Sequence, residues 1–309
     1  MLRFRVLLLI SRVALHLPRQ VTYAVAWLVG TIAYLVNEPA RTVCADNVQH
    51  ALGPVASPRR VSAAVRGCFR AAAYYYADLA RTPLMKPCHF LEHNVRDHGF
   101  EHIVQAYASG KGVIIATIHY GNPEYVAQSM SARGYHFLAL TETLEPPPLN
   151  ELFHSLRGSQ GQTFVDVGWQ GMKAALRHLK SGGAVCIVCD RDIQHAGELV
   201  RFFGETARIP TGAIDLARHT GAALIPAVTR RVGIDRFQLF VEPPLQLVRT
   251  GRPEQDRRAN TERLIQRFEP YLRRDPSQWF VLEQRIWGDA GVTPPPPAPP
   301  PAAARRGES

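Results

Sequence analysis

The sequence alternates between short apolar runs and amphipathic segments, and this alternation restricts the fold more than any other feature. Residues 112–118 (GVIIATI) and 184–190 (AVCIVCD) are continuous and rich in β-branched side chains, as buried parallel strands are. Segments with helical periodicity or helix-ending glycines lie between such runs. The pattern predicts an α/β domain with a mostly parallel central sheet flanked by helices.

The expected elements fill most of the region between residues 59 and 276. The expected strands are residues 112–118, 135–141, 162–167, 184–190, 222–231 and 236–245. The expected helices are residues 59–81, 97–110, 123–133, 149–158, 169–182, 211–221 and 253–276.

The chain divides into three regions by composition. Residues 1–40 are apolar but interrupted by Arg12, His16 and Pro18, so neither half reaches the roughly 20 apolar residues of a membrane span. We expect two short helices associated with a membrane surface, with arginines near anionic headgroups; the alternative is a helical pair packed on the main domain. Residues 41–288 form the main domain. Residues 289–309 are rich in proline and alanine and are expected to be disordered.

The charge and the cysteines restrict the partners and the compartment. The net charge of +10 suits nucleic acid, an anionic membrane or an acidic substrate, but the arginines are scattered without a nucleic-acid-binding signature, so no nucleic acid is expected. Five cysteines without a paired framework indicate a reducing compartment. Cys186 and Cys189 lie within a strand-like run, which favours core packing. The histidines of residues 89–102 fit no single helix face, and we expect no metal site.

His119 follows the first buried strand directly. Open α/β sheets bind ligands beyond the carboxyl ends of their strands, so this position favours a functional role. Asn122, Pro123 and Glu124 then form a good helix start, where a carboxylate is favoured in its charged form. The pair predicts an imidazole oriented by Glu124. Because no nucleophile motif is present, the pair would deprotonate a substrate hydroxyl. The alternative is that both residues only satisfy the ends of the strand and the helix.

Four blocks together resemble a known family. The His119-x-x-x-x-Glu124 spacing at a strand-to-helix turn is typical of glycerolipid and lipid A acyltransferases. The blocks FHSLRGSQGQ (153–162), the segment 189–231 with its FFG and P-x-G elements, and DPSQWFVLEQRIW (275–287) follow in the family's order. The chain resembles the superfamily of bacterial lipid A acyltransferases and phosphatidylinositol mannoside acyltransferases over residues 1–288. The DRD at 190–192 is closer to the mannoside branch, and Pro123 replaces the family's usual tryptophan.

The resemblance implies an activity and a location. A fatty acyl group would pass from acyl-CoA or acyl carrier protein to a hydroxyl of a membrane glycolipid, without a cofactor. The enzyme would lie on the cytoplasmic face of the bacterial inner membrane as a peripheral or monotopic protein. His119 would be the general base and Glu124 its orienting carboxylate. Gly121 and Asn122 would stabilise the oxyanion, and Arg157 would bind a phosphate.

The resemblance also implies further substrate-binding residues from the segment 189–231. They are Asp190, Arg191, Asp192, Phe202, Phe203, Glu205 and Arg208. The two aspartates are expected to have structural or substrate-orienting roles, and the two phenylalanines to pack or to touch the acyl chain. Glu198 and Glu205 remain alternative partners of His119.

Two other functions stay open at this point. One is a glycerol-phosphate or lysophospholipid acyltransferase, because these enzymes share the H-x-x-x-x-E spacing. The other is a non-catalytic lipid-binding protein of the same fold, although the presence of both His119 and Glu124 speaks against it.

Overall fold

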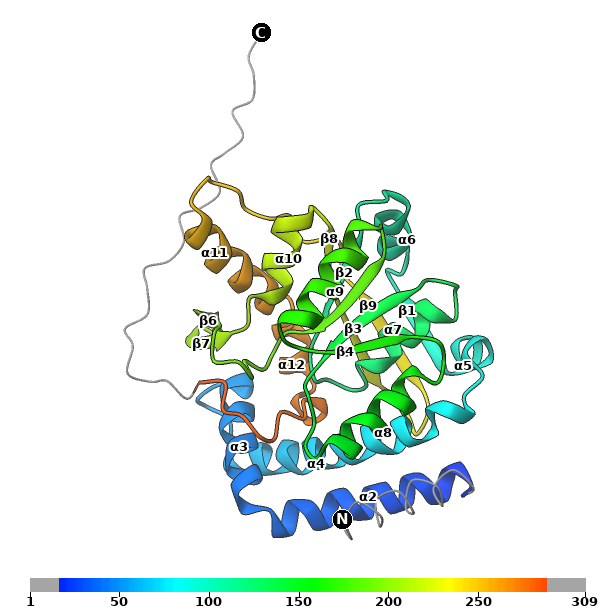
Figure 1. Cartoon of the computed structure of the whole chain (residues 1–309). Helices are drawn as coiled ribbons and strands as arrows, with labels where there is room; N and C mark the ends of the chain where they lie inside the picture. Colours follow the sequence, from blue (N-terminus) through cyan, green and yellow to red (C-terminus); the bar gives the residue numbers. More distant parts are fainter. Residues whose placement is uncertain (1–16, 288–309) are drawn as a thin grey trace.

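A seven-stranded sheet forms the centre of the molecule. The computed structural model describes residues 17–287, and its sheet has the strand order β1-β9-β8-β2-β5-β3-β4 (Figure 1). All neighbours pair in parallel except β8 and β9, so the expected mostly parallel α/β sheet is confirmed. The strands are β1 (Val95–His98), β2 (Val113–Thr117), β3 (Phe137–Thr141), β4 (Thr163–Asp166), β5 (Ala184–Val188), β8 (Ala223–Arg231) and β9 (Phe237–Val241).

Helices cover both faces of the sheet. Side chains from α9, α10, α11 and α12 fill the larger core cluster, and side chains from α6 and α7 fill the smaller one. The helices are α2 (Arg19–Val36), α3 (Glu38–Leu52), α4 (Pro58–Arg81), α5 (Pro87–Asn94), α6 (Glu101–Ala108), α7 (Glu124–Ser131), α8 (Pro147–Gly158), α9 (Trp169–Lys180), α10 (Gly212–Thr220), α11 (Pro253–Gln266) and α12 (Glu269–Arg274).

Strand β2 lies between β8 and β5, and every one of its residues is buried. Ile114 and Ala116 point into the larger cluster, whereas Val113 and Ile115 point into the smaller one. This division follows from the alternation of side chains along a strand. It explains why the segment carries no polar side chain until it reaches the carboxyl edge of the sheet.

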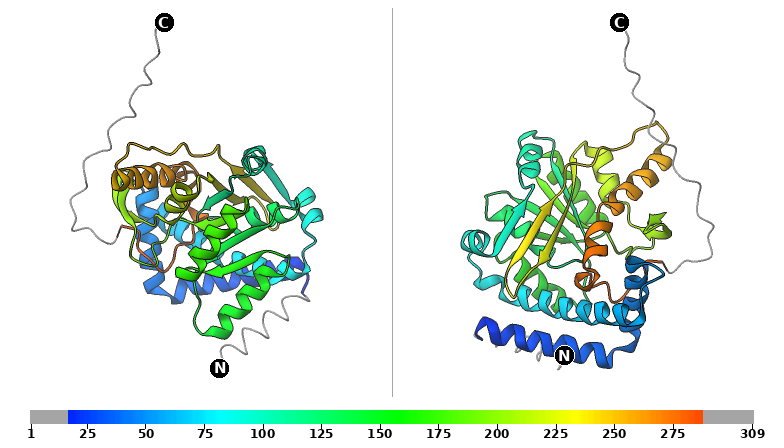
Figure 2. Two further views of the ribbon diagram at one scale, coloured as in Figure 1. Left: turned by 45° about the horizontal axis from the view of Figure 1, so that its top comes forward. Right: turned by 180° about the vertical axis from the view of Figure 1, so that it is seen from behind.

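Two long helices close the carboxyl edge of the sheet. Helix α4 crosses this edge, and α2 packs along its outer side, as the front and back views both show (Figures 1 and 2). Gly30 permits the close approach, because a Cβ there would lie 2.8 Å from the Cα of Arg70 and the carbonyl oxygen of Phe69. Helix α4 therefore lines the carboxyl edge, and α2 covers α4 from outside.

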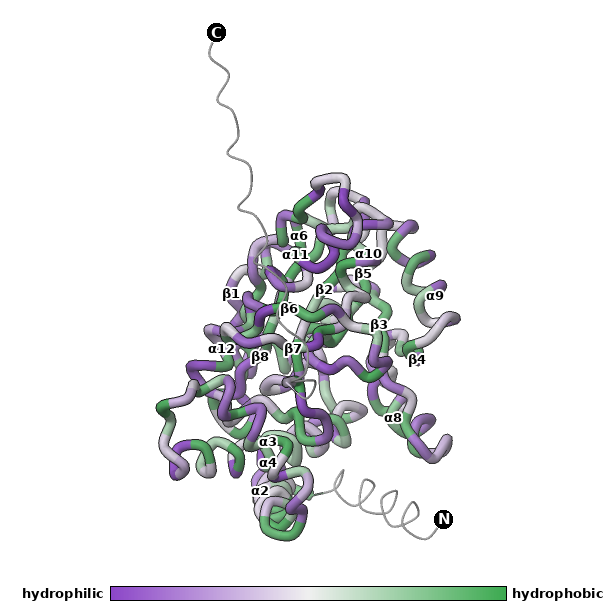
Figure 3. Tube along the Cα trace, turned by 90° about the vertical axis from the view of Figure 1, so that its left-hand side faces the viewer, coloured by the Kyte–Doolittle hydropathy of each residue, from purple (hydrophilic) through white to green (hydrophobic). Residues whose placement is uncertain are grey.

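The outer face of α2 is apolar and exposed. This face consists of Val21, Val25, Leu28, Val29, Ile32, Leu35 and Val36. Figure 3 shows α2 at one end of the molecule, with hydrophobic residues on the side away from α3 and α4. By length and composition no single described helix could cross a bilayer, although α2 and α3 together, bent by 95°, meet that criterion. The first of the two expected N-terminal helices, and the expected tail, lie outside the described residues.

Some local expectations were incomplete. The closing helix is divided into α11 and α12, with Pro270 in the first turn of α12. The segment around FFG is an antiparallel hairpin of β6 (Glu198–Phe202) and β7 (Glu205–Ile209), with Phe203 and Gly204 at positive φ in its turn. Strand β1 was also not expected. Its four residues contain three charged or ionisable side chains, so it has no apolar signature.

Each of the five cysteines is a free thiol. Cys186 and Cys189 are buried in and just after β5. Burial raises the pKa of the Cys186 thiol to about 12, so it stays protonated at neutral pH and behaves as an apolar core residue.

Candidate active site

His119 lies just beyond the end of β2, and its imidazole is held by Asp190. The Nδ1 atom is 2.7 Å from Oδ1 of Asp190, and the backbone N–H of His119 donates to Oδ2 at 2.9 Å. Asp190 follows β5, the parallel neighbour of β2, so the two residues emerge side by side at one edge. The carboxylate accepts from Nδ1, which leaves a lone pair on Nε2.

Asp190 is fully buried and hydrogen-bonded on both oxygens. The indole Nε1 of Trp279 donates to Oδ2 at 2.8 Å. Burial alone would raise the pKa of Asp190, but the imidazole and the donors from Trp279 and the His119 backbone outweigh it and lower the pKa. The carboxylate is therefore ionised at neutral pH, and its charge is available to stabilise an imidazolium.

Glu124 has a different partner from the one expected. Its Oε1 lies 2.9 Å from Nε of Arg157 and accepts a hydrogen bond from the hydroxyl of Tyr75 at 2.7 Å. Among the described residues, no hydrogen bond or ion pair joins Glu124 to His119. The expected contact was wrong because Glu124 sits in the first turn of α7 and faces α4 and α8, whereas the imidazole faces the end of β5.

Arg157 is consequently a largely buried cation that is already paired through part of its guanidinium. Its Nη2 also donates to the Tyr75 hydroxyl at 2.8 Å. Burial alone would lower the pKa of Arg157, but Tyr75 and Glu124 outweigh it and raise the pKa, so the guanidinium stays charged. Its Nη1 makes no hydrogen bond within residues 17–287, so one face of the fork remains free for a ligand.

Gly121 and Asn122 hold the turn instead of presenting free donors. The Gly121 N–H donates to the carbonyl of Gln278 at 3.0 Å, and the Asn122 N–H donates to the carbonyl of Thr229 at 3.3 Å. The Asn122 amide donates to Asp78 at 2.7 Å, while its Oδ1 caps α7 by accepting from the Glu124 N–H at 3.1 Å. The expectation that these groups bind an oxyanion therefore fails for this conformation.

The exposed part of the imidazole lies next to an aromatic wall. The ring of Phe280 meets His119 edge-on at 5.8 Å and stacks on Tyr75 at 5.3 Å. About a quarter (24%) of the His119 side chain is exposed, whereas Asp190 is at 0%. The imidazole is therefore accessible from solvent, but the carboxylate behind it is not.

Asp192 and Arg191 stabilise the loop beyond β5. Asp192 accepts from the N–H groups of Ala196 and Gly197, at 3.2 and 2.8 Å. Arg191 forms ion pairs with Glu142 at 3.1 Å and Glu283 at 3.3 Å. The structural role expected for Asp192 is thus observed, and Arg191 links the loop to the carboxyl end of β3.

The other predicted binding residues belong to the β6–β7 hairpin and its packing. Phe202 is buried and stacks on Trp287 at 5.3 Å, and Phe203 packs on both of these rings. Polar contacts also hold this region: Glu205 lies 2.9 Å from His50, Glu198 lies 3.0 Å from Arg257, and Arg208 donates to the Gly197 carbonyl at 3.0 Å. Glu198 and Glu205 are therefore not partners of His119 here.

A metal ion has no evident site in the described part of the chain. Within residues 17–287, no group of three or more His, Cys, Asp or Glu side chains converges in a way that could hold one. The histidines of residues 89–102 are spread over α5, β1 and α6.

Sequence reasoning missed two contributors to this site. Trp279 follows the short helix Pro276–Gln278 and reaches Asp190, and Tyr75 of α4 bridges Glu124 and Arg157. The P-x-Q-W element was noticed, but its contact spans 89 residues and depends on the tertiary fold. Tyr75 lies in a run of three tyrosines with no local signal to distinguish it.

Comparisons with known proteins assign the family. The sequence pattern described as bacterial lipid A biosynthesis acyltransferase matches residues 2–287. A phosphatidylinositol mannoside acyltransferase of Mycobacterium tuberculosis (strain CDC 1551 / Oshkosh) is 30% identical over 195 residues, or 62% of this chain and 60% of that relative. The protein of the same name from Mycolicibacterium smegmatis is 28% identical over 238 residues, 73% of each chain. The match thus spans about three fifths of the M. tuberculosis relative. Because the family pattern covers nearly all of the sequence, the chain belongs to the bacterial lipid A biosynthesis acyltransferase family.

Proposed function

We propose that the protein transfers a fatty acyl group from an acyl thioester to a hydroxyl of a membrane glycolipid. The observation that carries the proposal is the His119–Asp190 pair at the carboxyl edge of the sheet, with the imidazole partly exposed and the carboxylate buried. Such a pair, without a nucleophile of its own, suits deprotonation of a hydroxyl that the substrate brings. Family membership supports acyl transfer as the reaction.

The proposed chemistry needs one proton shuttle. Nε2 of His119 takes the proton of the acceptor hydroxyl while its oxygen attacks the thioester carbonyl. Asp190 stabilises the resulting imidazolium through Nδ1. The tetrahedral intermediate then collapses, the carbon–sulfur bond breaks, and the imidazolium returns its proton to the leaving thiolate. The products are an ester and a free thiol, and His119 is regenerated.

The acceptor and the donor are proposed from charge and from the relatives. The relatives' names make a phosphatidylinositol mannoside the first acceptor to test, and a lipid A precursor the second. Acyl-CoA and acyl carrier protein are both acidic, and the net charge of +10 favours either donor. The free Nη1 of Arg157 is the proposed contact for a substrate phosphate.

We propose that the outer face of α2 lies on the cytoplasmic surface of the inner membrane. Seven exposed aliphatic side chains on one helix face form a larger apolar patch than a helix in water normally carries. Helix α2 packs on α4, which contributes Tyr75 to the site, so this orientation brings the carboxyl edge close to lipid. Val29→Ser should weaken flotation with anionic vesicles several-fold. Val104→Ser changes a valine on α6 that is 42% exposed, against 53% for Val29, and should not weaken flotation; equal effects would contradict the assignment.

The decisive test of the function is acyl transfer by the full chain. Purified protein is mixed with long-chain acyl-CoA or acyl carrier protein and with phosphatidylinositol mannoside or lipid extract, and thiol release and lipid mass are followed. We expect both signals with wild type and neither with folded His119→Ala. Thiol release without lipid product would indicate hydrolysis instead. Transfer to lysophospholipid alone would favour the glycerolipid alternative, and inactivity with both donors would favour a non-catalytic lipid-binding protein.

A further inference from the structure

A buried carboxylate on α4 lies directly behind the turn that carries His119. Asp78 has only 1% of its side chain exposed and accepts hydrogen bonds from three side chains. Tyr23 of α2 donates to Oδ1, while Asn122 of the turn and Arg231 at the end of β8 donate to Oδ2. One carboxylate therefore joins α2, the sheet and the turn between His119 and Glu124.

The division of these bonds between the two oxygens has a physical consequence. An arginine fork and a carboxylate prefer to pair through two parallel hydrogen bonds. In that arrangement both oxygens of Asp78 would turn towards Arg231, and the hydrogen bond from the Asn122 amide to Oδ2 would have to change its geometry. The Tyr23 hydroxyl occupies Oδ1, and this leaves Oδ2 to be shared by Arg231 and Asn122.

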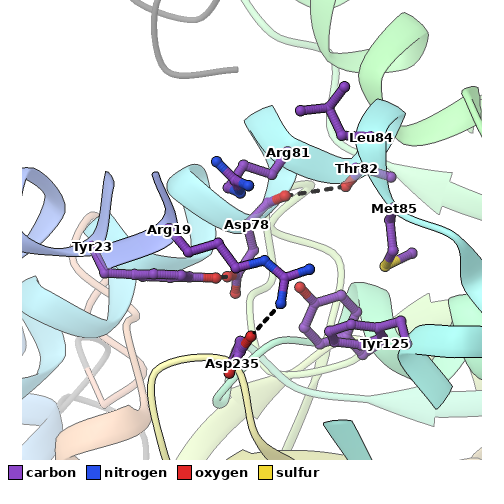
Figure 4. A pocket seen from close by; sticks show the side chains of 10 residues that line it. Arg19, Tyr23, Asp78, Arg81, Thr82, Leu84, Met85, Tyr125 and Asp235 are labelled. Carbon is purple, nitrogen blue, oxygen red and sulfur yellow. Dashed lines mark hydrogen bonds and ion pairs between the residues drawn. The ribbon is translucent and has the colours of Figure 1, made fainter. Parts of the chain in front are cut away.

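The surroundings of Asp78 allow such a rearrangement. A small pocket between α2, the end of α4, the segment leading into α5 and the loop at Asp235 includes Asp78 in its lining (Figure 4). In this view the Tyr23 hydroxyl points at the Asp78 carboxylate, and Arg19 pairs with Asp235 at the rim. The pocket gives the carboxylate room to turn once the hydroxyl is removed.

Asn122 is the member of the network that touches the proposed catalytic turn. Its amide is buried, so the Asn122 side chain and the turn must follow the Asp78 carboxylate to keep their hydrogen bond. His119 lies three residues before it, and a displacement of about 1 Å in a reacting group can cost roughly 100-fold in rate.

We propose that Tyr23 and Asp78 are positioning residues for the acyl-transfer site, acting on His119 through Asn122. This inference rests on the proposed acyl-transfer function and adds two residues that position its base. The helix whose outer face is proposed to lie on the membrane uses its inner face to hold the turn that carries the base.

The test compares two tyrosines of α2. Tyr23→Phe removes the hydroxyl that holds Asp78. Tyr34→Phe removes a hydroxyl on the same helix that pairs with Ser62 of α4 at 3.0 Å and has no link to the turn. We expect Tyr23→Phe to lower kcat about 10-fold with KM for the thioester changed less than two-fold. Tyr34→Phe should change kcat less than two-fold at a comparable melting temperature.

A second arm asks whether the effect passes through Asn122. In an Asn122→Ala background the side-chain amide that donates a hydrogen bond to Asp78 is absent, so Tyr23→Phe should lower kcat no further. The same 10-fold loss in that background, or equal losses for Tyr23→Phe and Tyr34→Phe, would overturn the inference. An inactive wild type would instead refute the proposed function, because both arms need an active starting enzyme.

Discussion

Asp190→Asn should nearly abolish acyl transfer without unfolding the protein. The two donors at Oδ2, the His119 N–H and the Trp279 indole, fix the orientation of the new amide, because its oxygen must accept them. The amide nitrogen then takes the place of Oδ1, 2.7 Å from Nδ1, and donates to it. Nδ1 becomes an acceptor, the proton moves to Nε2, and the imidazole has no lone pair facing the substrate.

The size of the loss follows from this change of tautomer. In a serine protease triad the same substitution costs about 10⁴-fold, and we expect roughly 10³-fold here, or about 4 kcal/mol of transition-state stabilisation. KM should change little, because Asp190 is buried and touches no substrate. The assay is thiol release with acyl-CoA and glycolipid, together with nitrogen NMR of the His119 ring to assign the protonated atom.

Asp192→Asn is the matched control for this substitution. It makes the same change two residues away, at a carboxylate that accepts from the backbone N–H groups of Ala196 and Gly197. We expect less than a 10-fold loss and an unchanged His119 tautomer. The reasoning is refuted if Asp190→Asn keeps a tenth of wild-type activity, or if Asp192→Asn loses as much.

Three further expectations concern stability. Gly121→Ala should abolish activity and lower the melting temperature, because its Cβ would lie 1.8 Å from a carbonyl oxygen of β8. Gly204 is also at positive φ but has open space around it, so Gly204→Ala should lower the free energy of unfolding by only about 1 kcal/mol. Glu124→Gln removes the charge that pairs with the largely buried guanidinium of Arg157, so calorimetry should show a loss of about 2–3 kcal/mol in the free energy of unfolding. The fall in kcat should be smaller than for Asp190→Asn. Because folding lowers the pKa of Asp190, its ionised carboxylate stabilises the fold above about pH 4, and this stabilisation is lost as the pH falls through the lowered pKa. Melting scans should therefore show that the higher melting temperature of wild type relative to Asp190→Asn disappears below about pH 4.

The fold was predictable because its central strands are buried on both faces. A continuous apolar run such as residues 112–118 has one stable place in a parallel sheet, and the position of His119 at its end follows from that place. Strand β1 and the β6–β7 hairpin lack this signal. Their side chains are charged or alternate, so tertiary contacts rather than local pattern decide their conformation.

The partner of His119 was not predictable from local spacing. Glu124 is five residues away in sequence, but the chain turns into α7 between the two residues and directs the carboxylate towards Arg157. Asp190 is 71 residues away and becomes adjacent only because β5 pairs with β2. The order of strands in a sheet is a property of the whole domain, and the sequence pattern of single strands does not contain it.

The site depends on the completed fold for a physical reason. A base that works on a substrate hydroxyl needs an ionised carboxylate behind it, and burial penalises that charge unless donors surround it. Here the donors come from the His119 backbone after β2 and from Trp279 near the C-terminal end of the domain. The segment after Pro276 also accepts from Gly121 and donates to the His119 carbonyl through Phe280. The C-terminal part of the domain thus supplies one of the donors that keep Asp190 ionised and helps to position His119, so acyl transfer should be lost when the segment after Pro276 is removed.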